Sequence, residues 1–232
     1  MRLQVFLSHN GVCSRRRAME LIQQGHVAVN GQVISEPSWK VNLPRDTITV
    51  DGKSVASKQY EYVILNKPQG YVTTMAEHRG EKSVLEFLPK EYHHLKPAGR
   101  LDKDTEGLLL FTNDGDVAYK LTHPKFNVDK VYYTEIRGQM SEASKRKLEK
   151  GVSIEGEMTS PAKIEDMKFH GGKTSFNMTI HEGKKRQIRL MCKAVGHEVV
   201  YLKRISQGPL TLGDLKAGQW RFLAEKEKEL LK

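Results

Sequence analysis

The chain has 232 residues, 38% of them hydrophobic, and a formal net charge of +10. A chain of this length can bury a genuine core, and two unequal domains fit its pattern better than one. Cys13 and Cys192 lie too far apart in the sequence to suggest a disulfide framework or a paired-cysteine metal site, and no apolar stretch is long enough for a signal peptide or a membrane span, so we expect a cytoplasmic protein.

The first sixty residues predict a small domain of two helices followed by hairpins. Apolar residues at helical spacing indicate a helix over residues 3–10. Ser14 is a typical cap for a second helix, which ends near Gly25. Two stretches of alternating apolar and polar residues then follow, and each contains or ends at a dipeptide that favours a tight hairpin turn: Asn30-Gly31 and Asp51-Gly52. The polar segment 54–59 is the natural linker, so we expect domains over residues 1–57 and 58–232.

Strands outnumber helices in the second domain. Strands are predicted over residues 60–65, 108–111, 131–136, 162–169 and 174–180, and helices over residues 83–87, 141–150, 186–195 and 225–232. This pattern predicts an α+β domain around a mixed, mainly antiparallel sheet.

The basic residues gather in short clusters, at Arg15 to Arg17, Lys145 to Lys147 and Lys184 to Arg186. Such clusters favour a folded surface that meets polyphosphate. Arg15, Arg16 and Arg17 stand at the start of a predicted helix, where backbone N–H groups already attract anions. The simpler interpretation is a solvated helix face.

The first fifty residues resemble a known module. The string RLQVFLSHNGVCSRRRAMELIQQGHVAVNGQVI, continued by DTITVDG, is similar to the S4 domain, a compact RNA-binding module of ribosomal and RNA-modifying proteins. The resemblance implies that Arg15, Arg16 and Arg17 contact RNA. It does not imply catalysis.

A second motif lies at residues 99–115, which read GRLDKDTEGLLLFTNDG. It places Asp102 beside Arg100 in a glycine-bounded loop before a buried strand, and such loops often carry chemistry. Taken alone, the acidic residues of this loop could simply cap a turn. The string closely resembles the signature of the RsuA and RluA type pseudouridine synthases. Similar blocks follow in order: Lys67-Pro68-x-Gly70, Lys130-x-Tyr132, EGKKRQIRLM with GHEV, Leu202-x-Arg204 and Gly208-Pro209-Leu210.

The resemblance implies an enzyme that isomerises uridine to pseudouridine in ribosomal RNA, with no cofactor and no metal. It assigns the reacting carboxylate to Asp102, which attacks C1′, attacks C6 or abstracts a sugar proton; the sequence leaves all three open. Arg189 is the implied partner that keeps this carboxylate ionised. Tyr132 is implied to stack on the uracil, and Arg100 to fill the gap left by the flipped base.

The remaining assignments concern the substrate. Leu202 is expected to contact the target nucleotide, and Lys67, Lys130 and Arg186 are expected to bind RNA. An S4 domain before the catalytic domain resembles the small-subunit branch, RsuA, so we expect a monomer that modifies one uridine of 16S rRNA. The alternatives are the same reaction on 23S rRNA, or a non-catalytic rRNA-binding assembly factor.

Overall fold

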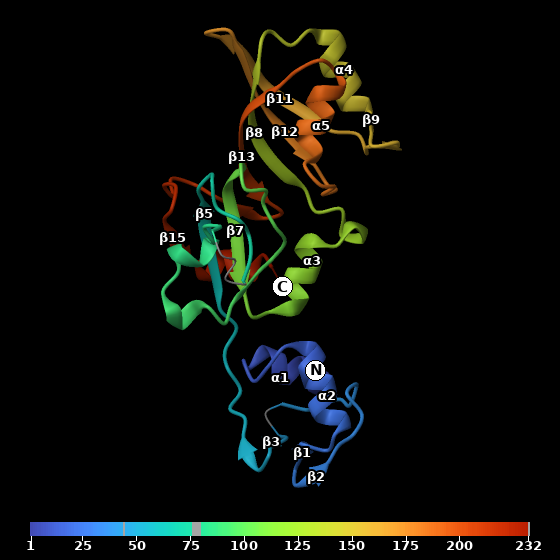
Figure 1. The fold of residues 1–232 in the computed structure, drawn as a ribbon, viewed down its shortest axis with the longest axis vertical. Coiled ribbons are helices and arrows are strands. Elements are labelled where there is room, and N and C mark those ends of the chain that lie inside the picture. Colours follow the sequence, from blue (N-terminus) through green and yellow to red (C-terminus); the bar gives the residue numbers. More distant parts are fainter. Residues whose placement is uncertain (44, 76–79, 232) are drawn as a thin grey trace. The chain divides into compact units, whose positions relative to one another are not determined.

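The computed structural model describes residues 1–43, 45–75 and 80–231. The chain forms two compact units (Figure 1). One comprises Met1–Glu61 with Asn113–Gly115, and the other Tyr62–Thr112 with Asp116–Lys232. Among the helices in the described part of the chain, none is long and apolar enough to cross a membrane.

The N-terminal unit contains two helices and a small antiparallel sheet. Its elements are α1(Leu3–His9), α2(Arg15–Gln23), β1(Val27–Val29), β2(Gln32–Val33), β3(Ile48–Val50) and β4(Lys53–Ser54). The Ser14 side chain accepts a hydrogen bond from the Arg17 N–H and so begins α2. Apolar residues of both helices and of β1 and β3 form one core.

Both predicted hairpin turns of this unit are confirmed. Asn30 and Gly31 join β1 to β2, and Asp51 and Gly52 join β3 to β4. All four residues have positive φ, between 48° and 81°. This is the backbone that a two-residue turn between right-twisted strands requires, and Asn, Asp and Gly tolerate it best.

The second unit is built on one large sheet. Its strands are β5(Tyr62–Lys67), β6(Lys96–Pro97), β7(Glu106–Thr112), β8(Lys130–Arg137), β11(Lys163–His170), β12(Lys173–Ile180), β13(Val199–Gln207), β14(Leu210–Thr211) and β15(Trp220–Phe222). The main path runs β11-β12-β8-β13-β7-β5-β15. Only β7 and β13 pair in parallel among the described strands. The predicted α+β class with a mixed, mainly antiparallel sheet is therefore confirmed.

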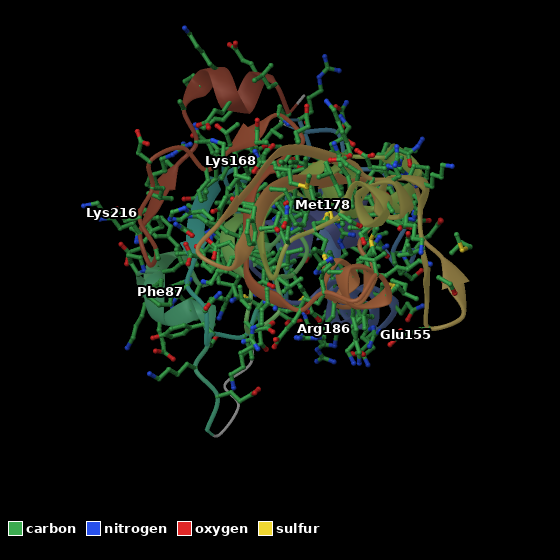
Figure 2. All side chains as sticks on the ribbon, turned by 90° about the horizontal axis from the view of Figure 1, so that it is seen from above. Phe87, Glu155, Lys168, Met178, Arg186 and Lys216 are labelled. Atoms are coloured by element: carbon green, nitrogen blue, oxygen red, sulfur yellow. The ribbon has the colours of Figure 1, made fainter. Side chains whose placement is uncertain are left out.

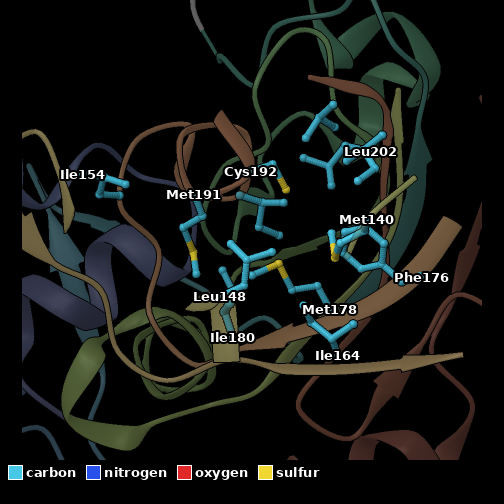
Figure 3. Close-up of a cluster of buried hydrophobic side chains, with 13 residues drawn as sticks. Met140, Leu148, Ile154, Ile164, Phe176, Met178, Ile180, Met191, Cys192 and Leu202 are labelled. Atoms are coloured by element: carbon cyan, nitrogen blue, oxygen red, sulfur yellow. The ribbon is translucent and has the colours of Figure 1, made fainter. Parts of the chain in front are cut away.

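Helices and short turns cover this sheet. They are η1(Val84–Phe87), η2(Lys90–Tyr92), α3(Gly115–Thr122), η3(Pro124–Phe126), α4(Glu142–Lys150), α5(Gln187–Ala194) and α6(Glu225–Glu229), with a small hairpin of β9(Ser153–Ile154) and β10(Glu157–Met158). Residues of α4 and α5 pack on β8, β11, β12 and β13 in one apolar cluster (Figure 3). Met178 lies inside this cluster, whereas Lys216 is exposed at the periphery (Figure 2).

Cys192 belongs to the same cluster. Its side chain is fully buried, and burial raises the pKa of the thiol to about 12. A thiol held protonated in an apolar core is a packing group and a poor nucleophile.

Candidate active site

A cavity of about 510 Å³ opens in the second unit. Its walls come from β8, β13, the loop that precedes β7 and the loop that precedes α5. Six residues predicted for the site line it: Arg100, Asp102, Lys130, Tyr132, Arg186 and Leu202. The fold therefore brings together residues that are up to about a hundred positions apart in the sequence.

Lys67 fixes the loop that carries Asp102. The Lys67 Nζ donates hydrogen bonds to the carbonyl oxygens of Pro68 at 2.9 Å, Lys103 at 3.3 Å and Thr105 at 2.8 Å. The side chain is 0% exposed. Burial lowers the pKa of this ammonium group to about 8, although the neighbouring carboxylates, Asp104 foremost, oppose the shift. The Nζ donors of Lys67 are thus used by the backbone of the site, and its predicted contact with RNA stays a prediction.

Thr73 fixes the same loop from the other side of Asp102. Its hydroxyl donates to the Leu101 carbonyl at 2.9 Å and accepts from the Leu101 N–H at 3.2 Å. Asp102 is half-buried between these anchors. Among the described residues, no hydrogen bond or ion pair engages its carboxylate, so the group is held in position at the cavity wall by its backbone.

Arg189 does not pair with Asp102, contrary to the implied assignment. Its Nε lies 3.2 Å from the Asp104 Oδ2, and its Nη2 donates to the Asp104 carbonyl at 2.8 Å. Its Nη1 donates to the Val199 carbonyl at 3.0 Å. The side chain thus joins α5, β13 and the Asp102 loop behind the cavity. Asp104 binds the Arg189 side chain instead of Asp102, because Asp104 faces the first turn of α5.

Asp104 also binds Arg186, in a two-pronged ion pair. The Arg186 Nη1 and Nη2 donate to the two Asp104 carboxylate oxygens at 3.0 and 2.8 Å. Burial works against ionisation, but the hydrogen bonds from Arg186 and the charges of Arg189 and Arg186 lower the pKa of Asp104. From the sequence, Asp104 is only a possible turn cap. The Asp-x-Asp spacing is visible there, but the loop conformation decides which carboxylate meets the arginines.

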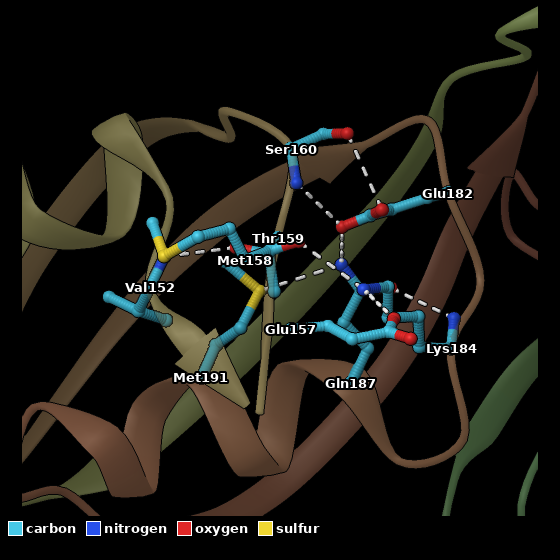
Figure 4. A network of polar contacts seen from close by, with 9 residues as sticks. All are labelled: Val152, Glu157, Met158, Thr159, Ser160, Glu182, Lys184, Gln187 and Met191. Carbon is cyan, nitrogen blue, oxygen red and sulfur yellow. Dashed lines mark hydrogen bonds and ion pairs between the residues drawn. The ribbon is translucent and has the colours of Figure 1, made fainter. Parts of the chain in front are cut away.

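Arg186 stands at the cavity wall because the preceding loop is tightly anchored. Glu182 accepts hydrogen bonds from the Ser160 N–H at 2.9 Å and from the Gln187 side chain, while the Lys184 N–H donates to Gln187 at 2.9 Å (Figure 4). Arg186 has a φ of 53°, a conformation that turns the chain into α5. Hydrogen bonds to Asp104 raise the pKa of Arg186, and the charges of Asp104 and Asp102 add to this shift. Arg186 and Asp102 thus line the same cavity, and their charges interact.

Lys130 forms part of the cavity floor. It is 8% exposed, and its Nζ donates to the carbonyls of Val128 at 3.0 Å and His181 at 3.3 Å. Burial, followed by the charge of Arg204, lowers its pKa. Only a nucleotide inside the cavity could reach a lysine buried to this extent, and the expected contact of Lys130 with RNA stays a prediction.

Tyr132 and Leu202 project into the cavity from neighbouring strands, β8 and β13. Leu202 is 4% exposed, and Tyr132 is half-buried. Tyr133 points to the opposite face of β8, where its ring packs edge-on against Tyr201 at a centroid distance of 6.1 Å. One apolar side chain and one aromatic ring thus line the cavity, with the exposed Arg100 at its entrance loop.

Three cavity-lining residues carry buried polar atoms that lack a hydrogen-bond partner among the described residues: Thr105 Oγ1, Arg204 Nη2 and Gln207 Oε1. The Arg204 Nε donates to the Leu108 carbonyl at 2.8 Å, and the Gln207 Nε2 to the Leu121 carbonyl at 3.1 Å. Buried polar groups are usually paired, so unpaired ones beside a cavity indicate unused capacity for a polar ligand. Neither Thr105 nor Gln207 is predicted as a site residue: Thr105 stands in the motif of residues 99–115 without an assigned role, and Gln207 lies outside the matching blocks.

Arg15, Arg16 and Arg17 occupy the first turn of α2 in the N-terminal unit, and all three are exposed. Arg17 pairs with Glu20 at 2.8 Å, a helical i,i+3 contact. The structure thus keeps all three charges on the surface, and their contact with RNA stays a prediction.

Comparison with known proteins identifies the family. Residues 61–194 match the family described as RNA pseudouridylate synthase, and residues 1–48 match the S4 domain. The chain belongs to the RNA pseudouridine synthase family. Like other pseudouridine synthases, it is an isomerase that acts on RNA, and the expected combination of an S4 domain with a synthase domain is confirmed.

Individual relatives are similar in sequence to this pseudouridine synthase along its whole length. It is 42% identical to the ribosomal large subunit pseudouridine synthase B of Bacillus subtilis (strain 168), over 100% of this chain and 95% of the relative. It is 39% identical to an uncharacterized RNA pseudouridine synthase of Aquifex aeolicus (strain VF5), over 98% of this chain and 92% of the relative. A crystal structure of pseudouridylate synthase superimposes with a TM-score of 0.71 at 31% identity, covering 100% of both chains.

Proposed function

We propose that this synthase isomerises one uridine of ribosomal RNA in the cavity that Asp102 lines, with residues 1–57 as the S4 domain and residues 58–232 as the catalytic domain. One observation carries the proposal. Asp102 stands at the wall of a cavity of about 510 Å³, on a loop that Lys67 and Thr73 fix on either side. Ligand pockets are commonly about 300–1,000 Å³, so a flipped nucleoside fits this volume.

The reaction breaks the C1′–N1 bond, rotates the uracil and joins C1′ to C5; C5 loses its proton and N1 gains one, so there is no net oxidation or reduction. Asp102 supplies the carboxylate, as nucleophile at C1′ or C6 or as acceptor of a sugar proton. Tyr132 and Leu202 enclose the uracil, and stacking on an aromatic ring offsets the cost of extruding the base. Thr105, Arg204 and Gln207 hold polar atoms that a uracil edge can engage after a small movement.

In this proposal Arg186 supplies positive charge to the cavity that Asp102 lines, and Arg189 positions the loop through Asp104. Arg186 lines the cavity and its pKa responds to the Asp102 charge. Asp104 holds both guanidinium groups, so it orients the charge that faces the reacting carboxylate. Arg100, exposed on the same loop, occupies in this proposal the gap that the extruded base leaves.

A further part of the proposal concerns which ribosomal subunit contains the substrate RNA. An S4 domain in front of the catalytic domain favours 16S rRNA, with the protein acting as a monomer in the cytoplasm. The Bacillus relative matches over 95% of its own length and is named for the large ribosomal subunit. This relative favours 23S rRNA as the second candidate substrate.

The test compares Asp102→Asn with Asp214→Asn, which removes an exposed carboxylate far along the chain. Each variant is expressed in a strain lacking the gene, and pseudouridines are mapped across ribosomal RNA by carbodiimide labelling. We expect Asp102→Asn to bind the RNA but to lower isomerisation by at least about a hundredfold, and Asp214→Asn to behave as wild type. The pseudouridine that is missing in the Asp102→Asn strain shows whether the substrate is 16S or 23S rRNA. If no pseudouridine is missing, only the alternative of a non-catalytic assembly factor is left.

A further inference from the structure

An exposed aromatic cluster lies at the end of α3 and in η3. We call Tyr119, His123, Lys125 and Phe126 the aromatic platform. Tyr119 is 44% exposed and Phe126 is 40% exposed. The Tyr119 ring lies 4.6 Å from the His123 ring and 5.6 Å from the Phe126 ring, which it meets at 90°. Large aromatic side chains gathered on a surface usually mark an interaction site.

The platform combines aromatic faces with positive charge. The Lys125 Nζ lies 4.9 Å from the centre of the Tyr119 ring and 4.7 Å from that of Phe126. These are favourable cation–π distances, and they keep the ammonium group beside both rings. Aromatic rings next to basic side chains are the pattern by which proteins bind unpaired nucleotides: bases stack on the rings and phosphates meet the cations. A purely apolar partner would leave the Lys125 charge without a function.

The local backbone holds the platform in place. Pro124 begins η3, and the His123 Nδ1 accepts the Lys125 N–H at 3.2 Å. Asn127 then takes a left-handed conformation, with a φ of 48°, which ends the turn. Because these contacts already fix the segment, little ordering is left to occur when a ligand binds.

The same segment borders the cavity. Thr122, three residues after Tyr119 on α3, lines the cavity, and so does Lys130 at the start of β8. Three residues of α-helix span about 4.5 Å along the axis, and residues three apart are neighbours on the helix surface. The Leu121 carbonyl accepts the side chain of Gln207, another lining residue. The platform therefore adjoins the cavity within one compact unit.

We propose that the aromatic platform binds unpaired nucleotides of the substrate RNA next to the target uridine. Bases stack on Tyr119 and Phe126, and Lys125 meets an adjacent phosphate. A flipped uridine leaves its neighbours unstacked, and the platform gives them a new stacking partner. This inference rests on the proposed function of the cavity, but it concerns binding, so the two can be tested separately.

The experiment measures binding of the full-length protein to a fluorescently labelled single-stranded RNA of about twelve uridines, within the usual length of single-strand sites. We expect the double variant Tyr119→Ala, Phe126→Ala to bind at least about tenfold more weakly, since one stacked base accounts for roughly five- to hundredfold in affinity. The exchange Tyr119→Phe with Phe126→Tyr keeps both rings and should bind as wild type. Phe169→Ala removes an aromatic side chain that is 51% exposed on β11 and serves as the matched control.

A second readout uses the same RNA with 5-iodouridine, which crosslinks to stacked aromatic side chains under ultraviolet light. We expect the crosslinked peptide to include Tyr119 or Phe126. An unchanged affinity of the double variant together with crosslinks elsewhere would overturn the platform, and so would an equal loss in Phe169→Ala. If the platform binds RNA but Asp102→Asn isomerises uridine normally, the platform stands and the proposed role of Asp102 fails.

Discussion

At the scale of single residues, Lys67 and Asp104 show how charged groups build the site without being its reacting groups. Lys67 gives three hydrogen bonds to backbone carbonyls, and Asp104 binds two arginines. Both residues stand within the sequence motifs that resemble the family. Their roles could not be predicted, because burial of Lys67 and the direction of Asp104 depend on segments distant in the chain.

Lys67 predicts a particular dependence of stability on pH. Its pKa is about 8 in the folded protein and 10.5 ordinarily. Between these values the unfolded chain binds more protons, so the free energy of unfolding rises with pH. Relative to Lys67→Met, we expect wild type to gain up to about 3 kcal/mol from pH 8 to pH 10.5, measured by urea unfolding. Lys168→Met, at an exposed site on β11, should keep the wild-type slope; a matching slope in Lys67→Met would contradict the buried ammonium group.

At the scale of secondary structure, the parallel pairing of β7 and β13 joins the two halves of the sheet beside the cavity. The predicted strand over residues 108–111 lies within β7. Neither β13 nor α3 is predicted from the sequence. Lys203 and Arg204 obscure the strand pattern of β13, yet Arg204 is only 2% exposed, because its Nε is satisfied by the Leu108 carbonyl. The Leu108 carbonyl becomes the partner of Arg204 only when β7 pairs with β13, so the sequence alone does not predict it.

Gly107 permits this pairing. It has a φ of 117°, and a Cβ added there would lie 2.3 Å from the Arg204 carbonyl oxygen. We expect Gly107→Ala to lower the free energy of unfolding by at least about 3 kcal/mol and to abolish activity, since a backbone atom of β13 would have to move. Gly138 has a φ of 81° and open space around it, so Gly138→Ala should cost only about 1–2 kcal/mol. Similar losses in the two variants, measured by urea unfolding, would show that close approach to β13 is unimportant.

At the scale of the whole molecule, positive charge is shared between two units. The net charge of +10 includes the arginines of α2 and the basic residues of α4. Charge alone attracts RNA to any basic surface. The resemblance to the S4 domain predicts, more specifically, that the arginines of α2 contact RNA, and this prediction can be separated from net charge by experiment.

The triple variant Arg15→Gln, Arg16→Gln, Arg17→Gln tests this role of α2. We expect weaker binding to a ribosomal RNA fragment, and a slope of log affinity against log salt that falls by about 0.7–0.9 for each phosphate that the protein no longer neutralises. Stability should not change, because all three side chains are exposed. The triple variant Lys145→Gln, Arg146→Gln, Lys147→Gln removes the same charge from α4 and should weaken binding less. Equal effects, measured by salt titration, would point to net charge alone.

The sequence by itself determined the family, the S4 domain, both hairpin turns of the N-terminal unit and the α+β class. These features depend on residues that are close together in the sequence. A dipeptide determines a turn, alternation of apolar and polar residues determines a strand, and the spacing of motif residues identifies the family. Only the tertiary structure decided that Arg189 meets Asp104, that Lys67 is buried, and that the Tyr119 and Phe126 rings contact each other. Side-chain partners and burial are set by whichever distant segment packs nearby, and no local pattern encodes that choice.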